Sequence, residues 1–425
     1  MKRLSANYNT ISSRYRLFSE SLKIPPVYNQ SYFEECDAVI NGSASPEVIR
    51  KGKAWVDPDK LNDSQIANLS CSEFQAKYWY PDFAMSKEEA EYPIAYAILV
   101  HRNAEQVVRL LQYIYWPQNV YCIHVDTTSA PDFIDAMNVV IDCMPDNVLP
   151  VSNRTASVWG SFGVLLAAVN CLKDLDRWPL PWKYVQIYSG TDMPLKTNLE
   201  LVKIFKIFNG SNDVGLNFAQ PYRYVDKKYQ EKFMVEKAIG IGYRRIAPHH
   251  LSIFKGSFQA TMSRDFISFL ANNQVANDLL LWMRGMHVPD EEYWSTLVHN
   301  AHIEPPGYFP GSCLEYYRSL NIRKDFVSRY QIWQNPVSVC KSQKFTMASC
   351  VFGIEDVPLL LKQIHLAAHK FYGYFEPAGQ RCMAKDLYRR TFIERKANIN
   401  VAAYEKLAAV RFQSLPPELK PRFSC

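Results

Sequence analysis

The stretch Pro93-Ile94-Ala95-Tyr96-Ala97-Ile98-Leu99-Val100 decides the fold class of this chain. It is a short apolar run bounded by the polar His101-Arg102-Asn103, a pattern typical of a strand that is buried on both faces. A helix is expected directly after it, with Asn103 as the N-cap and Pro117 as the stop. The apolar residues of this helix fall on one face: Val107, Leu110, Leu111 and Ile114.

The same alternation of strand and helix continues downstream. Strands are expected at residues 119–126, 147–151 and 184–188, with a helix at residues 163–175 and another that runs from Asn198, as its cap, to about residue 208. This order predicts an α/β fold in which helices cover both faces of a parallel sheet. Ligands of such sheets bind beyond the carboxyl ends of the strands, where Asp126 stands.

The rest of the chain is less regular. Residues 218–250 are basic and aromatic without a clear period. From residue 330 onward, strands, a loop bounded by cysteines and a helix at residues 357–371 are expected.

Composition limits the classes of protein that this chain can be. Its 425 residues, 48% of them hydrophobic, suffice for one large or two ordinary domains. Net charge is only +6, and no run of five or more Lys or Arg is present. Nucleic acid is therefore not expected as a partner.

The cysteines and glycosylation sequons bear on the compartment. Ten cysteines are compatible with either cytosolic thiols or disulfides. The sequence contains no Cys-x-x-Cys pair, so a structural zinc site is not expected. Asn-x-Ser/Thr triplets, of which roughly three or four are expected by chance, occur at Asn29, Asn41, Asn62, Asn68, Asn153 and Asn209. They favour the secretory route, although the N-terminus has no apolar run fit for a signal peptide or a membrane anchor.

Several blocks of sequence resemble the core-2/I-branching β-1,6-N-acetylglucosaminyltransferases. The blocks lie at residues 101–106, 117–126, 189–200 and 255–257, and in the triplet Pro289-Asp290-Glu291. With the cysteine positions, the resemblance spans roughly residues 36–385.

This resemblance implies a fold and an activity. The fold is a nucleotide-sugar transferase of type A, a Rossmann-like mixed sheet flanked by helices and stapled by disulfides. The activity is transfer of N-acetylglucosamine, with inversion, from UDP-GlcNAc to an O-glycan of a glycoprotein. The implied divisions are a stem and N-terminal extension at residues 1–90, a catalytic domain at 91–385 and a C-terminal extension at 386–425. A Golgi lumenal, type II membrane setting is expected.

The resemblance also implies a disulfide framework. Its pairs are Cys36 with Cys382, Cys71 with Cys143, Cys122 with Cys171, and Cys340 with Cys350. Two cysteines, Cys313 and Cys425, are left over, which leaves a homodimer open.

An inverting transferase needs a base that takes the proton of the acceptor hydroxyl. By resemblance this base is Glu291, with Glu292 as the local competitor. Two triplets match the metal-binding Asp-x-Asp pattern: Asp174-Leu175-Asp176 and Asp57-Pro58-Asp59. The first ends a predicted helix, where we expect a solvated face, and the second lies in the stem. The resemblance implies a reaction without a metal, so no metal or other cofactor is expected.

The resemblance places basic residues at the donor diphosphate. Lys370 matches the lysine of the family. Met347 stands where the family has an arginine, and Lys344 is a nearby substitute without the bidentate fork of an arginine. Val100, His101, Asp126 and Asp192 are candidates for the nucleotide and sugar, and Tyr330 and Trp333 for the acceptor.

Three other functions remain open from the sequence. A peptide O-xylosyltransferase shares this domain. A carbohydrate-binding relative without catalysis is compatible with the departure at Met347. A cytosolic nucleotide-binding protein would explain the sheet pattern, but no Gly-rich phosphate loop is present.

Overall fold

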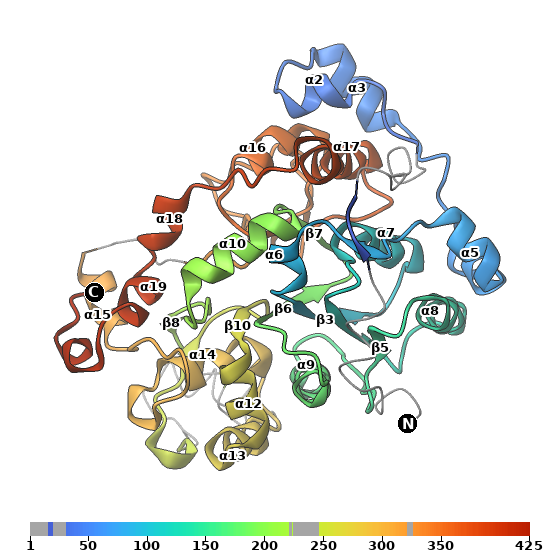
Figure 1. Ribbon diagram of the computed structural model, residues 1–425. Coiled ribbons are helices and arrows are strands. Elements are labelled where there is room, and N and C mark those ends of the chain that lie inside the picture. The colour runs from blue at the N-terminus through green and yellow to red at the C-terminus, as the bar shows by residue number, and fades with distance from the viewer. Residues whose placement is uncertain (1–15, 20–30, 221–222, 224–245, 321–325) are drawn as a thin grey trace, which may run out of the picture.

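The computed structural model describes residues 16–19, 31–220, 223, 246–320 and 326–425. Within these ranges, the largest sheet has five strands in the order β10-β6-β3-β4-β5 (Figure 1). Neighbouring strands are parallel among β3 (Ile94–Val100), β4 (Val120–Val125), β5 (Val148–Pro150) and β6 (Tyr184–Ser189). The edge strand β10 (Thr261–Ser263) is antiparallel to β6. The mixed α/β sheet expected from the sequence is confirmed.

Helices cover both faces of this sheet, because alternate side chains of its strands point to opposite sides. Tyr96 and Ile98 of β3 face a core shared with α7 (Ala104–Ile114) and α8 (Pro131–Cys143). Ala95 and Ala97 face a second core. Three helices contribute to that core: α9 (Phe162–Arg177), α12 (Arg264–Asn272) and α13 (Gln274–Trp282).

Asn103 caps α7 as predicted, because its side chain accepts a hydrogen bond from the Gln106 N–H. The predicted cap of α10 (Asn198–Phe208) is wrong by one residue. Thr197 is the N-cap, and it forms a reciprocal capping box with Glu200. Asn198 instead bonds Glu89 and Asn119 in the interior.

The helix predicted at residues 357–371 is also wrong. Only α16 (Val357–Leu361) is helical there, and residues 367–369 form β13 (Ala367–His369). This strand pairs antiparallel with β7 (Asp192–Pro194), the short strand that comes shortly after β6 in the chain. Lys370 therefore follows a strand beside Asp192 rather than ending a helix.

The N-terminal helices pack on the same core as the sheet. Side chains from residues 33–78, among them Phe33, Val39, Phe74 and Tyr78, belong to the core of α7 and α8. Figure 1 shows α2 and α3 beside α16 and α17. The helices of this part are α2 (Cys36–Ile40), α3 (Pro46–Ala54), α4 (Asp63–Ala67), α5 (Cys71–Lys77) and α6 (Lys87–Ala90).

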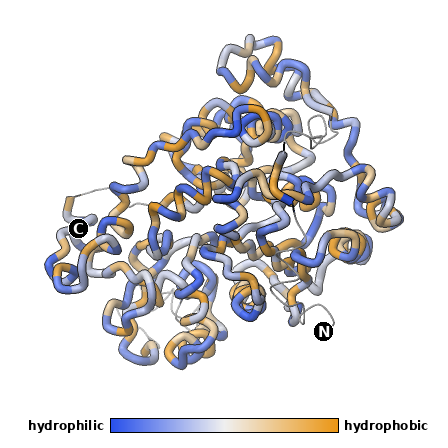
Figure 2. The backbone as a smooth tube through the Cα atoms, in the orientation of Figure 1, coloured by the Kyte–Doolittle hydropathy of each residue, from blue (hydrophilic) through white to orange (hydrophobic). Residues whose placement is uncertain are grey.

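The C-terminal half completes the fold. Besides α12, α13 and α16, its described α-helices are α14 (Tyr293–His299), α15 (Cys313–Ser319), α17 (Pro377–Tyr388), α18 (Val401–Glu405) and α19 (Ala408–Gln413). The short strands outside the main sheet are β1 (Arg16–Leu17), β2 (Phe83–Ala84), β8 (Asn217–Phe218), β9 (Phe254–Lys255), β11 (Phe345–Thr346) and β12 (Ser349–Cys350). In the described part of the chain, no helix has the length and apolarity needed to cross a membrane. Figure 2 shows hydrophobic residues in short pieces along the tube.

All ten cysteines form disulfides within the chain. The four predicted pairs are present. The two cysteines left over in the sequence, Cys313 and Cys425, pair with each other. Neither is free to link two chains. The sequon residues Asn41, Asn62, Asn68, Asn153 and Asn209 are exposed, while Asn29 lies outside the described residues.

Candidate active site

A cleft of about 670 Å³ lies beyond the carboxyl end of β6, where Ser189 contributes to its wall. This is the edge of the sheet at which ligands of α/β folds bind. Of the predicted site residues, Glu291, Tyr330, Trp333 and Lys370 line the cleft. Cations, carboxylates and aromatic rings from distant parts of the chain therefore meet around one space large enough for a nucleotide sugar.

Glu291 ends a short 3-10 helix, η5 (Pro289–Glu291), on the wall of this cleft. One carboxylate oxygen accepts a hydrogen bond from Arg223 Nη1 at 2.7 Å and lies 3.0 Å from Lys255 Nζ. The backbone C=O of Glu291 accepts from the Gly256 N–H at 2.6 Å. Both the side chain and the main chain of Glu291 are thus held, and the carboxylate keeps 23% of its surface exposed.

The carboxyl groups on either side of Glu291 have different surroundings. Burial, with the charge of Glu291, raises the pKa of Asp290 to about 7. Burial likewise raises the pKa of Glu292 to about 8. Neither of its oxygens has a hydrogen-bond partner in the described structure. Glu292 is fully buried and does not line the cleft. Only Glu291 presents an open carboxylate held by cations.

Lys370 also lines the cleft and is buried. Burial and the charge of Arg102 lower the pKa of its ammonium group. Met347 also lines the cleft. Lys344, in the loop closed by the Cys340–Cys350 disulfide, does not.

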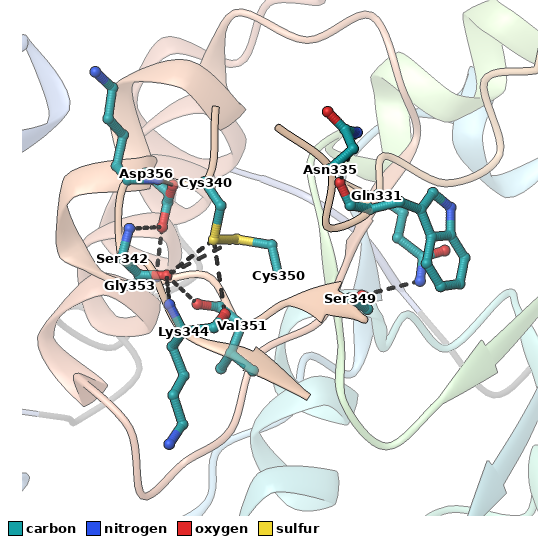
Figure 3. The surroundings of a disulfide bond; sticks show 12 residues. Gln331, Asn335, Cys340, Ser342, Lys344, Ser349, Cys350, Val351, Gly353 and Asp356 are labelled. Atoms are coloured by element: carbon teal, nitrogen blue, oxygen red, sulfur yellow. Dashed lines mark hydrogen bonds between the residues drawn. A yellow bond between two sulfur atoms is a disulfide. The ribbon is translucent and has the colours of Figure 1, made fainter. Parts of the chain in front are cut away.

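Figure 3 shows the Lys344 side chain extending away from Gln331 and Ser349, two residues that line the cleft. Lys344 is an exposed residue of this loop. The cationic substitute for Met347 that the sequence suggested is therefore not directed into the cleft in this structure.

Asp192 is buried beside the cleft, against the lining residues Ser189, Arg329 and His369, in a network that the sequence did not reveal. It accepts hydrogen bonds from the Ser189 N–H at 2.6 Å and from His369 Nδ1 at 2.8 Å. Arg329 Nη2 lies 3.4 Å from the same carboxylate, and its guanidinium packs over the Tyr188 ring. Although burial alone would raise the pKa of Asp192, Arg329 and His369 hold it below its usual value.

The other donor-side candidates lie at the ends of their strands but outside the lining of the cleft. Val100 is buried, and His101 is exposed in the turn after β3. Asp126 accepts hydrogen bonds from Thr128 and from the Ser157 N–H, and therefore holds the loop after β4. The structure does not bring these three residues to Glu291.

Neither Asp-x-Asp triplet lies in the cleft. Asp174 and Asp176 accept hydrogen bonds from Ser152 and Ser268. Asp174 is partly exposed on its helix, with 13% of its side-chain surface accessible. In the second triplet, Asp57 pairs with Arg381. No group of three or more potential ligands among the described residues could hold a metal ion.

The residues that sequence reasoning missed are Arg223, Lys255, Arg329 and His369. Lys255 opens the block 255–257 and Arg329 precedes Tyr330, so both stood next to recognised motifs. His369 immediately precedes Lys370, but its partner Asp192 is 177 residues away. Only the pairing of β7 with β13 brings them together.

Comparison with known proteins agrees with this architecture. Residues 94–358 match the family model described as Core-2/I-Branching enzyme. The chain is 30% identical, over 84% of its length and 82% of the relative's, to beta-1,3-galactosyl-O-glycosyl-glycoprotein beta-1,6-N-acetylglucosaminyltransferase 3 of Mus musculus. A Danio rerio relative, numbered 4 in the same series, is 32% identical over 77% of this chain and 78% of its own. A Homo sapiens beta-1,3-galactosyl-O-glycosyl-glycoprotein beta-1,6-N-acetylglucosaminyltransferase is 31% identical over 76% of this chain and 75% of its own. The chain belongs to the Core-2/I-branching enzyme family.

Proposed function

We propose that this glycosyltransferase moves N-acetylglucosamine from UDP-GlcNAc to a hydroxyl of an O-glycan, forming a β-1,6 branch with inversion and without a metal ion. The names of its relatives support the transferred sugar and the linkage. The observation that carries the proposal is the placement of Glu291 and Lys370 on the wall of one cleft. In this proposal the enzyme works in the Golgi lumen on glycoproteins.

Glu291 is the general base of this reaction. Its carboxylate takes the proton of the acceptor hydroxyl while the hydroxyl oxygen forms a bond to the anomeric carbon. The bond from that carbon to the diphosphate oxygen breaks, and its electron pair leaves with uridine diphosphate. Arg223 and Lys255 fix the orientation of the base.

Lys370 stabilises the charge that develops on the departing diphosphate. The carboxylates that line the cleft are Asp290 and Glu291. Glu291 is paired with cations, and the raised pKa of Asp290 favours its neutral form. Such a set is poorly suited to hold a divalent ion, which supports a cationic side chain in place of a metal.

Tyr330 and Trp333 form the acceptor side of the proposal. Trp333 is 52% exposed and lines the cleft, where a sugar ring can stack on its indole. Asp192 is proposed to hold the floor of the donor site. Val100, His101 and Asp126 stay proposals for the nucleotide, at the carboxyl ends of β3 and β4.

One observation favours a second candidate, a carbohydrate-binding relative that has lost catalysis. Met347 gives the cleft no charge at the position where an arginine was expected, and Lys344 does not line the cleft. Such a protein would bind the donor without releasing uridine diphosphate.

The test is release of uridine diphosphate from UDP-GlcNAc with a Galβ1,3GalNAc acceptor in excess chelator. Glu291→Gln should lower the acceptor-dependent rate by about a hundredfold to ten-thousandfold, as expected for loss of a general base. Glu315→Gln, the same change at an exposed glutamate in α15, is the matched control and should keep the native rate. An unchanged rate in Glu291→Gln would overturn the base assignment. Donor binding without turnover by the native chain would favour the binding protein.

A further inference from the structure

We infer that His369, oriented by Asp192, is a second cationic group for the donor diphosphate beside Lys370. The inference rests on the proposed function and concerns the same cleft. His369 lines the cleft, and its side chain is 15% exposed. It is the last residue of β13, and Lys370 follows it directly in the chain.

The backbone and Asp192 together fix the position of the imidazole. His369 pairs with Asp192 in the register of β13 and β7, and its N–H donates to the Tyr330 C=O at 2.9 Å. The ring nitrogen Nδ1 lies 2.8 Å from a carboxylate oxygen of Asp192. Because an ionised carboxylate only accepts hydrogen bonds, Nδ1 carries the proton.

The other ring nitrogen, Nε2, is the atom left for a ligand. Within the described ranges, no protein group bonds to it, and it is not among the buried polar atoms without a partner. When the imidazole is neutral, Nε2 is an acceptor and repels a phosphate oxygen. When it is protonated, Nε2 donates a charged hydrogen bond to that oxygen.

Charged groups surround His369. Asp192 faces it from β7, and Arg329 shares the charge of that carboxylate at 3.4 Å. Lys370 follows His369 directly in the chain, and His365 also lines the cleft. A diphosphate that enters this mainly cationic group favours uptake of a proton by His369.

Arg329 is a buried cation next to the pair formed by His369 and Asp192. The Arg329 side chain is only 2% exposed, and its Nε and Nη1 atoms have no hydrogen-bond partner in the described structure. Its charge is fixed near Asp192, whereas an imidazole in general can gain or lose a proton. Met347, on the same cleft, supplies no charge. Donor affinity should therefore depend on a titratable cation.

The test is calorimetric binding of UDP-GlcNAc between about pH 5.5 and about pH 8, a range that spans the ordinary histidine pKa. The diphosphate of this intact nucleotide sugar keeps its charge over that range, so the ligand adds no slope. The native affinity should fall by about tenfold as pH rises, because the protonated imidazole is the binding form. His369→Asn should bind at all pH values with about the native affinity at high pH.

Matched variants separate His369 from its neighbours. Lys370→Ala should weaken binding at every pH and keep the slope. Other titratable residues near the cleft are Asp290, Glu292 and His365. Only the part of the pH dependence of affinity that His369→Asn removes is therefore assigned to His369. His369→Gln is the second variant should the asparagine variant fail to fold.

The proton uptake itself gives an independent readout. At about pH 7, binding enthalpies in two buffers of different ionisation enthalpy should show proton uptake by the native chain and none by His369→Asn. Tight native binding without a pH slope, or an equal slope in His369→Asn, overturns this inference alone. If neither UDP-GlcNAc nor UDP-xylose binds at any pH, the proposed function falls, and this inference falls with it.

Discussion

Glu291 and Glu292 are adjacent in the chain, and their different surroundings give two chemically identical side chains different properties. Glu291 is partly exposed on the cleft and paired with Arg223 and Lys255. Glu292 is fully buried, and its nearest cation is Arg223 at 4.0 Å. A buried carboxyl without hydrogen bonds is stable mainly in its neutral form. Glu292 is thus a structural residue and Glu291 the one open to a substrate.

The raised pKa of Glu292 predicts a stability that falls with pH. Its pKa is about 8 in the folded chain, against 4.5 for an ordinary glutamate. The stabilisation by the neutral carboxyl is complete below the unfolded pKa and is lost as pH rises to the folded pKa. The slope is on the order of 1.4 kcal/mol per unit of pH within that window.

Glu292→Gln, which is neutral at every pH, should remove this part of the slope. The measurement is the free energy of unfolding in urea at about pH 5 and about pH 8. Asp290 titrates in the same direction, so some slope should remain. Glu315→Gln should leave the native slope intact. An identical slope in Glu292→Gln would show that the folded carboxyl is already charged at neutral pH.

The placement of single residues on the cleft was predictable where a motif carried them, as for Glu291 and Lys370. Residues whose role comes from a distant partner were not. His369 acquires its orientation from Asp192, and Arg223 meets Glu291 across 68 residues. Lys344 was proposed from sequence spacing alone, which does not determine the direction of a side chain in a loop.

At the scale of elements, the sheet could be read from the sequence because its strands are apolar on both faces. The segment after α16 was misread, since a short apolar run does not distinguish a buried helix from a buried strand. Ala367 and Ala368 are fully buried, and backbone pairing with β7 decides their conformation. That pairing places Lys370 at the cleft.

The N-cap of α10 gives an element-scale prediction. Thr197→Ala removes the hydroxyl that accepts from the Glu200 N–H, and it leaves a helix end without its cap. The expected loss of stability is about 1 kcal/mol, measured as a fall in the midpoint of urea unfolding. Thr197→Ser keeps a hydroxyl at this place and should lose much less. Equal losses in the two variants would mean that the methyl group, not the cap, stabilises the helix end.

At the scale of the whole molecule, disulfides tie distant parts of the chain to one core. Cys36 and Cys382 are 346 residues apart, and they join α2 to α17. The pair Cys313–Cys425 was not predictable from the family framework. It joins α15 to the C-terminus beside a small cluster that includes Phe309 and Phe412.

Removing two different disulfides should separate stability from function. Cys313–Cys425 spans 112 residues and Cys340–Cys350 spans 10. In the chain-entropy account, loss of the first costs about 5 kcal/mol and loss of the second about 3 kcal/mol. None of the lining residues comes from the C-terminal helices α18 and α19. The double variant Cys313→Ser/Cys425→Ser should therefore unfold more easily but keep its affinity for UDP-GlcNAc when folded.

The Cys340→Ser/Cys350→Ser variant should lose less stability but more affinity for UDP-GlcNAc. Its loop carries Met347 and Ser349, which line the cleft, so loosening it should weaken ligand binding at a smaller cost in stability. Urea unfolding and calorimetric donor binding measure the two effects. Hydrogen exchange should become faster in α18 and α19 for the first variant and in β11 and β12 for the second. If the first variant lost more affinity than the second, the C-terminal segment would have to support the cleft directly.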